Sequence, residues 1–135
     1  MNIQWQSSNT LTIITYRVII MYEIEYYTKR SGQQPVAEWI ESLDKNFRNV
    51  IRDKIEMLAN YGLRLINTEM LKNLSGKDKD FYELRGSQCR IGTFYDRDHN
   101  RFVLLHGWLK KKQKQVQDIE KARSLLHEYL FTQEG

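Results

Sequence analysis

Hydrophobic positions near the start of the chain follow first the spacing of a strand and then that of a helix. Residues 22–28 alternate between apolar and polar faces, and a period of two predicts a half-buried strand. Its apolar face consists of Tyr22, Ile24 and Tyr26. Pro35 suits the first turn of a helix, where its missing N–H has no cost. The helical stripe that follows is Val36, Trp39, Ile40 and Leu43.

A second helix is predicted directly after the first. Residues 44–46 supply a short turn, and Gly62 is a natural C-terminal stop. Two helices joined by so short a turn form an antiparallel hairpin. The apolar stripe of the second helix is Phe47, Val50, Ile51, Ile55 and Leu58.

The second half of the chain alternates strand-like runs with turn-rich separators. Residues 63–80 are polar and predict a loop, which Leu71 and Leu74 tie to the core. Gly86-Ser87 and residues 96–100 separate the later runs, so an antiparallel meander is the simplest connection. The three predicted strands are Phe81–Arg85, Cys89–Tyr95 and Phe102–Leu109.

A final amphipathic helix completes the order β-α-α-β-β-β-α. This order predicts an α+β fold with a small, mainly antiparallel sheet, an N-terminal helical hairpin and a C-terminal helix. There is no internal repeat. The apolar positions of the last helix are Val116, Ile119, Ala122, Leu126 and Tyr129.

Residues 1–20 differ from the rest of the chain and make a poor secretory signal, because no basic residue precedes Arg17. Leu11, Ile13 and residues 17–20 would allow an extra strand. The alternative, which we favour, is that Met21 is the natural start and that residues 1–20 are a misread upstream extension. The predicted domain therefore spans residues 21–135.

Composition limits the class of protein. With 135 residues, of which 41% are hydrophobic and 28% charged, the chain is long enough for one core and too short for two ordinary ones. No run approaches the roughly 18 apolar residues of a membrane-spanning helix. The single Cys89 excludes an internal disulfide framework. We therefore expect a cytoplasmic domain.

The positive charge is concentrated in one segment. The formal net charge is +4, but residues 72–114 alone carry 11 basic and 5 acidic side chains. Residues 1–71 are balanced, with 8 of each sign, and residues 115–135 have 2 basic and 4 acidic side chains. A local positive field attracts phosphates, so the predicted meander is the candidate polyanion-binding surface.

Three cations converge within this segment. Arg85 ends the first meander strand, Arg90 opens the second, and Lys110 follows the third. Adjacent strands lie about 4.8 Å apart, so the three side chains can gather over one face. Two interpretations are open: an anion occupies the cluster, or the cations point separately to solvent and pair with acidic neighbours such as Glu83.

A phosphate at this cluster would permit RNA cleavage without a metal, because RNA carries its own nucleophile, the 2′-hydroxyl. Arginine forks match the oxygens of the transition state. An acid and a base are also required, and Lys110 and Tyr95 are the candidates.

No zinc-type cluster or glycine-rich phosphate loop is present, and the histidines His99, His106 and His127 lie on different predicted elements. We expect no metal and no cofactor.

These motifs resemble the RelE/HigB superfamily of toxins, and most closely its phage-derived subgroup. The resemblance extends from about Met21 to Leu130. The residues that carry it are FYELR at 81–85, RI at 90–91, FY at 94–95, VLLHGWLKK at 103–111 and DIEKA at 118–122.

The resemblance implies a toxin of a type II toxin–antitoxin system that enters the ribosome, cleaves mRNA and inhibits translation. It also implies a cognate antitoxin, often a helix-turn-helix protein of the HigA type. Arg85 and Arg90 match the strand arginines that hold the scissile phosphate in the family, and Lys110 and Lys111 match its lysine pair. Further RNA-contacting candidates are Lys72, Lys112 and Lys114.

The sequence departs from the family pattern at three places. Lys114-Gln115-Val116 replaces a common Thr-Pro, Cys89 replaces a usual Tyr, and residues 1–20 are additional. Two other functions remain open at this point. One is a ParE-like toxin that poisons gyrase without cutting RNA, and the other is a non-catalytic, phage-derived regulator that binds nucleic acid.

Overall fold

The structure is a computed structural model that describes residues 21–74, 76–111 and 115–134. Its elements follow the predicted order with two additions, the 3₁₀ helix η1 and the strand β3. In chain order they are β2 (Glu23–Tyr26), α1 (Pro35–Ser42), α2 (Lys45–Tyr61), η1 (Gly62–Leu65), β3 (Leu71–Asn73), β4 (Phe81–Gly86), β5 (Cys89–Asp96), β6 (Arg101–Leu109) and α3 (Gln115–Glu134).

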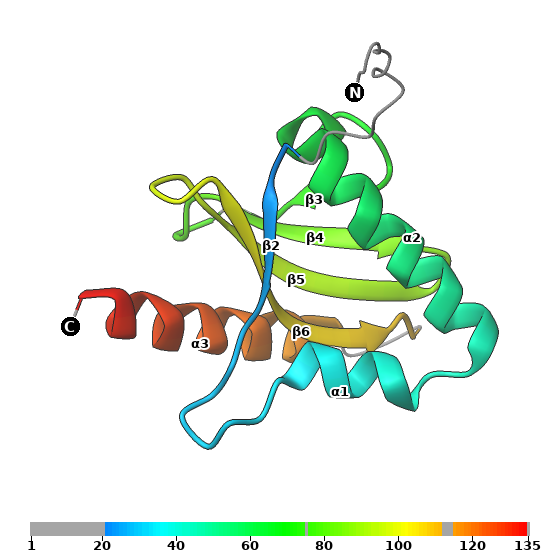
Figure 1. The fold of residues 1–135 in the computed structure, drawn as a ribbon, viewed down its shortest axis with the longest axis horizontal. Coiled ribbons are helices and arrows are strands. Elements are labelled where there is room, and N and C mark those ends of the chain that lie inside the picture. The colour runs from blue at the N-terminus through cyan, green and yellow to red at the C-terminus, as the bar shows by residue number, and fades with distance from the viewer. Residues whose placement is uncertain (1–20, 75, 112–114, 135) are drawn as a thin grey trace, which may run out of the picture.

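The five strands form one mixed sheet in the order β2-β6-β5-β4-β3. β4, β5 and β6 are the predicted antiparallel meander, and β2 joins β6 in parallel. The helices α1 and α2 lie on one face of this sheet and α3 lies on the other (Figure 1). The prediction of an α+β fold with a mainly antiparallel sheet is therefore confirmed.

The prediction that residues 63–80 form a loop is wrong in part. Leu71–Asn73 is an edge strand that pairs with β4, with Leu71 opposite Leu84. Leu71 is fully buried and Leu74 is partly buried, so both tie this segment to the core as expected. A strand of three residues at a sheet edge is too short to show an alternating pattern, because only one of its side chains is buried.

The core has two parts, one on each face of the sheet. The larger part lies under α1 and α2 and includes Ile40, Ile51 and Leu58, and the smaller part lies under α3. Asp44 caps α2 by accepting a hydrogen bond from the Phe47 N–H at 3.0 Å. Gly62 ends α2 as predicted, with a φ of 50° and no room for a Cβ beside the Tyr22 ring.

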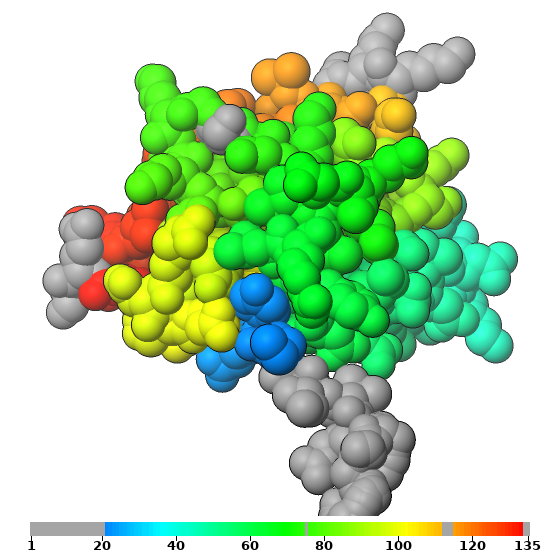
Figure 2. Space-filling model, turned by 90° about the horizontal axis from the view of Figure 1, so that it is seen from above, coloured from blue at the N-terminus to red at the C-terminus, as the bar shows by residue number. Residues whose placement is uncertain are grey.

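The start of the described chain is fixed between α2 and the β5–β6 turn (Figure 2). The Met21 N–H donates to the Ala59 carbonyl at 3.1 Å, and the Asn100 side chain donates to the Met21 carbonyl at 3.1 Å. Residues 1–20, on which an extra strand or a misread extension was predicted, lie outside the described residues. Within the part that the structure describes, no helix is long and apolar enough to cross a membrane.

Candidate functional site

The β4–β5 hairpin brings two of the predicted cations together. Gly86 pairs with Cys89, so Ser87 and Gln88 form a two-residue loop, and Arg85 lies directly opposite Arg90. Side chains directly opposite each other in an antiparallel pair lie on the same face. Ser87 has a φ of 54°, as the first position of a type II′ turn requires.

Lys110 is the third member of this cluster. Its N–H donates to the Gln88 carbonyl at 2.7 Å, which fixes the end of β6 beside the hairpin loop. The three cations therefore lie close together, as the sequence predicts. They share one pocket of about 460 Å³, lined by Lys54, Glu69, Met70, Arg85, Gly86, Ser87, Arg90 and Lys110. We call this the cationic pocket.

A buried carboxylate lies beneath the two arginines. Glu83 is two residues before Arg85 on the same strand and is 2% exposed. Its Oε2 accepts a hydrogen bond from Arg85 Nε at 2.7 Å and lies 3.5 Å from Arg90 Nε. The pairing with Glu83 that the sequence left open is therefore present, and it coexists with the cluster.

The two arginines differ in their exposure. The Arg85 side chain is 34% exposed, whereas that of Arg90 is 8% exposed. Arg90 Nη1 donates to the Ser87 and Cys89 carbonyls at 2.8 and 2.9 Å. Burial lowers the pKa of Arg90 and the neighbouring Arg85 adds to this effect, while Glu83 opposes it. Arg85 is therefore the arginine that presents more surface to a ligand, and Arg90 braces the hairpin beneath it.

Two charged residues of the cationic pocket were missed by the sequence analysis. Lys54 comes from α2, and its aliphatic stem crosses the hairpin at Gly86, where a Cβ would lie 2.7 Å from Lys54 Cγ. Glu69 comes from the connection before β3 and is an exposed carboxylate. The glycine at position 86 is the one sequence signal for Lys54, because a residue without a side chain leaves room for another side chain to pack there. No local pattern pointed to Glu69.

Tyr95 is not part of this cluster. It ends β5, five residues from Arg90, or about 16 Å along the strand. The ring is buried against Tyr22 and Phe102, and its hydroxyl donates to Asn100 Oδ1 at 2.6 Å. Burial raises the pKa of Tyr95 further from neutrality, with Tyr22 adding to the effect. Its position is that of a core aromatic residue that anchors the β5–β6 turn.

The remaining predicted RNA-contacting lysines have different positions. Lys111 is exposed and lines a shallow pocket next to the cationic pocket, together with Arg90 and Lys110. Lys72 is exposed on the edge strand β3, opposite Glu83 in the sheet register. Lys112 and Lys114 lie outside the described residues.

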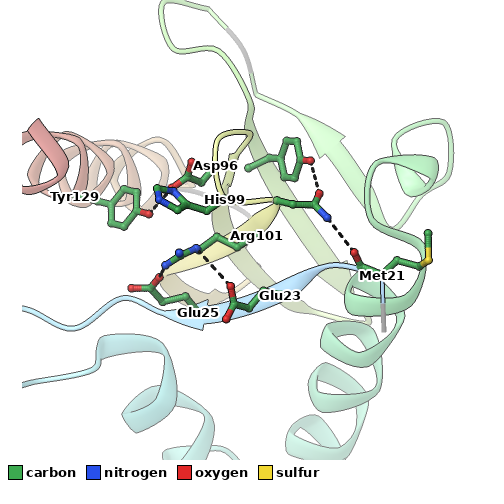
Figure 3. Close-up of polar contacts among 9 residues, drawn as sticks. Met21, Glu23, Glu25, Asp96, His99, Arg101 and Tyr129 are labelled. Carbon is green, nitrogen blue, oxygen red and sulfur yellow. Dashed lines mark hydrogen bonds and ion pairs between the residues drawn. The ribbon is translucent and has the colours of Figure 1, made fainter. Parts of the chain in front are cut away.

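Each histidine has an acidic partner at a different place in the fold. His106 Nε2 lies 3.0 Å from Asp118 Oδ1, and His127 Nε2 lies 3.1 Å from Asp78 Oδ1. His99 Nδ1 lies 2.9 Å from Asp96 Oδ2, at the far end of β5 from the cationic pocket (Figure 3). Among the described residues, no three His, Cys, Asp or Glu side chains are grouped to hold a metal ion.

Comparisons with known proteins bear on both family and fold. Residues 38–127 match the family described as phage-derived protein Gp49-like. Among solved structures, a chain from the crystal structure of the toxin–antitoxin complex RelBE2 of Mycobacterium tuberculosis is similar, with a TM-score of 0.51 and 15% identity over 67% of this chain and 100% of that chain. No curated protein sequence matches the chain. The RelE-like fold expected from the sequence is thereby confirmed.

Proposed function

The chain belongs to the family of phage-derived Gp49-like proteins, and from this membership, its RelE-like fold and its cationic pocket we propose that it is the toxin of a toxin–antitoxin pair. We further propose that the toxin is a ribosome-dependent endoribonuclease that cleaves mRNA without a metal. The structural neighbour was solved as a toxin–antitoxin complex, which supports a cognate antitoxin as partner. A helix-turn-helix antitoxin of the HigA type and a cytoplasmic site of action are parts of the same proposal.

The observation that carries this proposal is the convergence of four cations from three parts of the fold on one pocket. Arg85 and Arg90 come from the β4–β5 hairpin, Lys110 from the end of β6 and Lys54 from α2. Such a cluster repels itself unless an anion or acidic groups occupy it. Glu83 offsets part of the charge from beneath, and a phosphate would complete the neutralisation from the open side.

The cleavage step follows from the chemistry of RNA. The 2′-oxygen attacks the adjacent phosphorus and the bond to the 5′-oxygen breaks, so the products are a 2′,3′-cyclic phosphate and a 5′-hydroxyl. Negative charge builds up on the two non-bridging oxygens, where the Arg85 guanidinium acts as an electrostatic stabiliser. Arg90 holds the hairpin that carries Arg85 through its hydrogen bonds to the Ser87 and Cys89 carbonyls.

The step also needs one proton removed and one supplied. Glu69 is the exposed carboxylate of the cationic pocket, and we propose it as the base that accepts the 2′-hydroxyl proton. Lys110 and Lys54 are the ammonium groups of the same pocket, and either would donate the proton to the leaving 5′-oxygen in this proposal. Tyr95, the other candidate from the sequence, has no part in this step because its hydroxyl is held in the core by Asn100.

Primer extension on mRNA from cells that express the chain tests this function. We expect new transcript ends inside translated regions with the wild type and none with Arg85→Ala. Arg52→Ala is the matched control, because Arg52 is an exposed α2 arginine that pairs with Glu41. Intact transcripts together with altered DNA supercoiling would contradict the proposal and favour a gyrase poison. Unchanged mRNA and unchanged DNA would favour a non-catalytic regulator.

A further inference from the structure

A second cavity lies at the edge of β6, beyond the last residue that β2 covers. β2 pairs with β6 only as far as Tyr26 and Leu104, so the rest of this edge has no neighbouring strand in the described part of the chain. The helices α1 and α3 contact β6 from opposite faces of the sheet (Figure 1). A cavity of about 250 Å³ is lined by residues of both helices and of β6. We call it the edge pocket.

Two cations from different elements line the edge pocket. Lys29 comes from the loop before α1 and Lys121 from α3. Neither makes an ion pair with another described residue within 4.0 Å. Glu38 also lines the pocket, but its Oε2 accepts a hydrogen bond from the Gln34 N–H at 3.0 Å at the start of α1. Glu38 offsets one of the two ammonium charges, so Lys29 and Lys121 leave the pocket with a net charge of +1, which attracts an anion from solution.

Two aromatic rings form rigid walls of the edge pocket. The Trp39 ring lies directly on Gly107, where a Cβ would come within 2.2 Å of it. His106 is held by Asp118 and stacks on Trp108 with ring centroids 5.6 Å apart. Paired cations beside flat apolar surfaces are the groups that proteins use to bind the phosphates and bases of single-stranded nucleic acids.

β6 connects the edge pocket to the cationic pocket. His106 lies on β6 and Lys110 directly follows the strand, four residues later, or about 13 Å along an extended chain. Between them, Trp108 is the register partner of Arg90. The two pockets therefore lie about two nucleotides apart along the same strand.

We propose that the edge pocket binds a second nucleotide of the RNA whose scissile phosphate lies in the cationic pocket. Lys29 and Lys121 contact its phosphate, and its base stacks on Trp39. This inference rests on the proposed function, because the RNA strand that it extends is the substrate of the cationic pocket. The edge pocket adds affinity and fixes the direction of the strand, and it takes no part in bond breaking.

The salt dependence of RNA binding tests this proposal. The affinity of an eight-nucleotide single-stranded RNA would be measured by fluorescence anisotropy at several salt concentrations. Each lost phosphate contact reduces the slope of log affinity against log salt by about 0.7. We expect the double variant Lys29→Ala/Lys121→Ala to bind at least about tenfold more weakly, with the slope reduced by about 0.7 to 1.4. A dinucleotide, too short to reach both pockets, is expected to lose less affinity in the variant than the octamer does.

The matched control is Lys45→Ala/Lys79→Ala, which removes the same charge from two exposed lysines outside both pockets. If the two double variants have equal slopes, or if the wild type does not bind the octamer more tightly than the dinucleotide, the edge pocket does not bind RNA. The loss of mRNA cleavage in Arg85→Ala would still stand in that case. If Arg85→Ala has no effect on cleavage, the proposed function itself fails.

Discussion

A single buried carboxylate determines how the two arginines of the cationic pocket are presented. One oxygen of Glu83 contacts the Nε side of Arg85 and lies near that of Arg90. The Nε contact leaves the two terminal nitrogens of Arg85 for a phosphate, which is the bidentate arrangement that arginine favours. Glu83 is therefore a positioning residue for the proposed cleavage rather than a catalytic one.

Replacing Glu83 with glutamine should separate binding from cleavage. The amide keeps the size of the side chain but loses the charge that orients Arg85, and misplacement by about 1 Å can reduce a rate about 100-fold. We expect Glu83→Gln to cleave mRNA about 10 to 100 times more slowly, while its affinity for RNA stays equal or rises because the pocket gains positive charge. Single-turnover cleavage and anisotropy measure the two effects, with exposed Glu41→Gln as control. A parallel loss of rate and affinity would contradict the positioning role.

Arg90 and Arg85 should differ in their effect on stability. Arg90→Ala removes two hydrogen bonds to the hairpin carbonyls and a buried partner of Glu83, a type of loss that costs about 3 kcal/mol. Arg85 is one-third exposed but donates a hydrogen bond to the buried Glu83, so Arg85→Ala should cost about 2 kcal/mol. Urea unfolding of both variants checks this difference. Equal losses would show that Arg90 is no more structural than Arg85.

How far the site was predictable depends on sequence separation. Arg85 and Arg90 flank a two-residue loop and Lys110 follows the strand that pairs with β5, so the antiparallel register alone brings them together. Lys54 lies on α2 and Glu69 on the connection before β3. They reach the pocket because these segments pack against the hairpin, and no local sequence pattern encodes such packing. Tyr95 was a candidate by its residue type, but its position at the other end of β5 places it in the core.

At the scale of elements, the helices and the meander were predictable because each repeats its hydrophobic spacing regularly over many residues. The strand β3 was not, since a three-residue edge strand buries only Leu71. The parallel pairing of β2 with β6 was also beyond the sequence pattern. That pairing joins residues about 78 positions apart, and periodicity describes which face of a strand is buried but not its neighbour.

The far ends of β5 and α3 are joined by a polar network around Asp96 (Figure 3). The Tyr129 hydroxyl donates to Asp96 Oδ2 at 2.6 Å, and His99 contacts the same oxygen. Burial by itself raises the pKa of Asp96, but these hydrogen bonds outweigh it and hold the pKa below its ordinary value of 3.8. A carboxyl with a lowered folded-state pKa stabilises the fold above the unfolded pKa, and this contribution is lost as the pH falls through the folded value.

Asp96→Asn should therefore destabilise the protein in a manner that depends on pH. At pH 7 we expect the free energy of unfolding to fall by about 2 kcal/mol, as for the loss of charged hydrogen bonds. The difference from the wild type should shrink below about pH 4, where the wild-type carboxyl becomes protonated as well. Urea unfolding between pH 3 and pH 7 checks this, with the exposed neighbour Asp98→Asn as control. A difference that is constant over this range would contradict it.

At the scale of the whole molecule, the two ends of the sheet carry different polar networks. The hairpin loop end of β4 and β5 carries the cationic pocket, while the opposite end carries the Asp96 network and Met21, the first described residue. The +6 charge of residues 72–114 does not cover the surface evenly, because Asp78, Asp80 and Asp96 pair with basic or hydroxyl groups away from the pocket. The cations Lys54, Arg85, Arg90 and Lys110 gather where the RNA is proposed to bind.

The most direct test of the central claim is cleavage of a defined mRNA in a purified translation system. The mRNA would be incubated with the purified chain in the presence and absence of ribosomes, and the product ends would be identified. We predict cleavage only with ribosomes, with 2′,3′-cyclic phosphate and 5′-hydroxyl ends, full activity in Arg52→Ala and none in Arg85→Ala. Intact mRNA with wild-type protein and translating ribosomes, or equal cleavage by Arg85→Ala, would contradict the account.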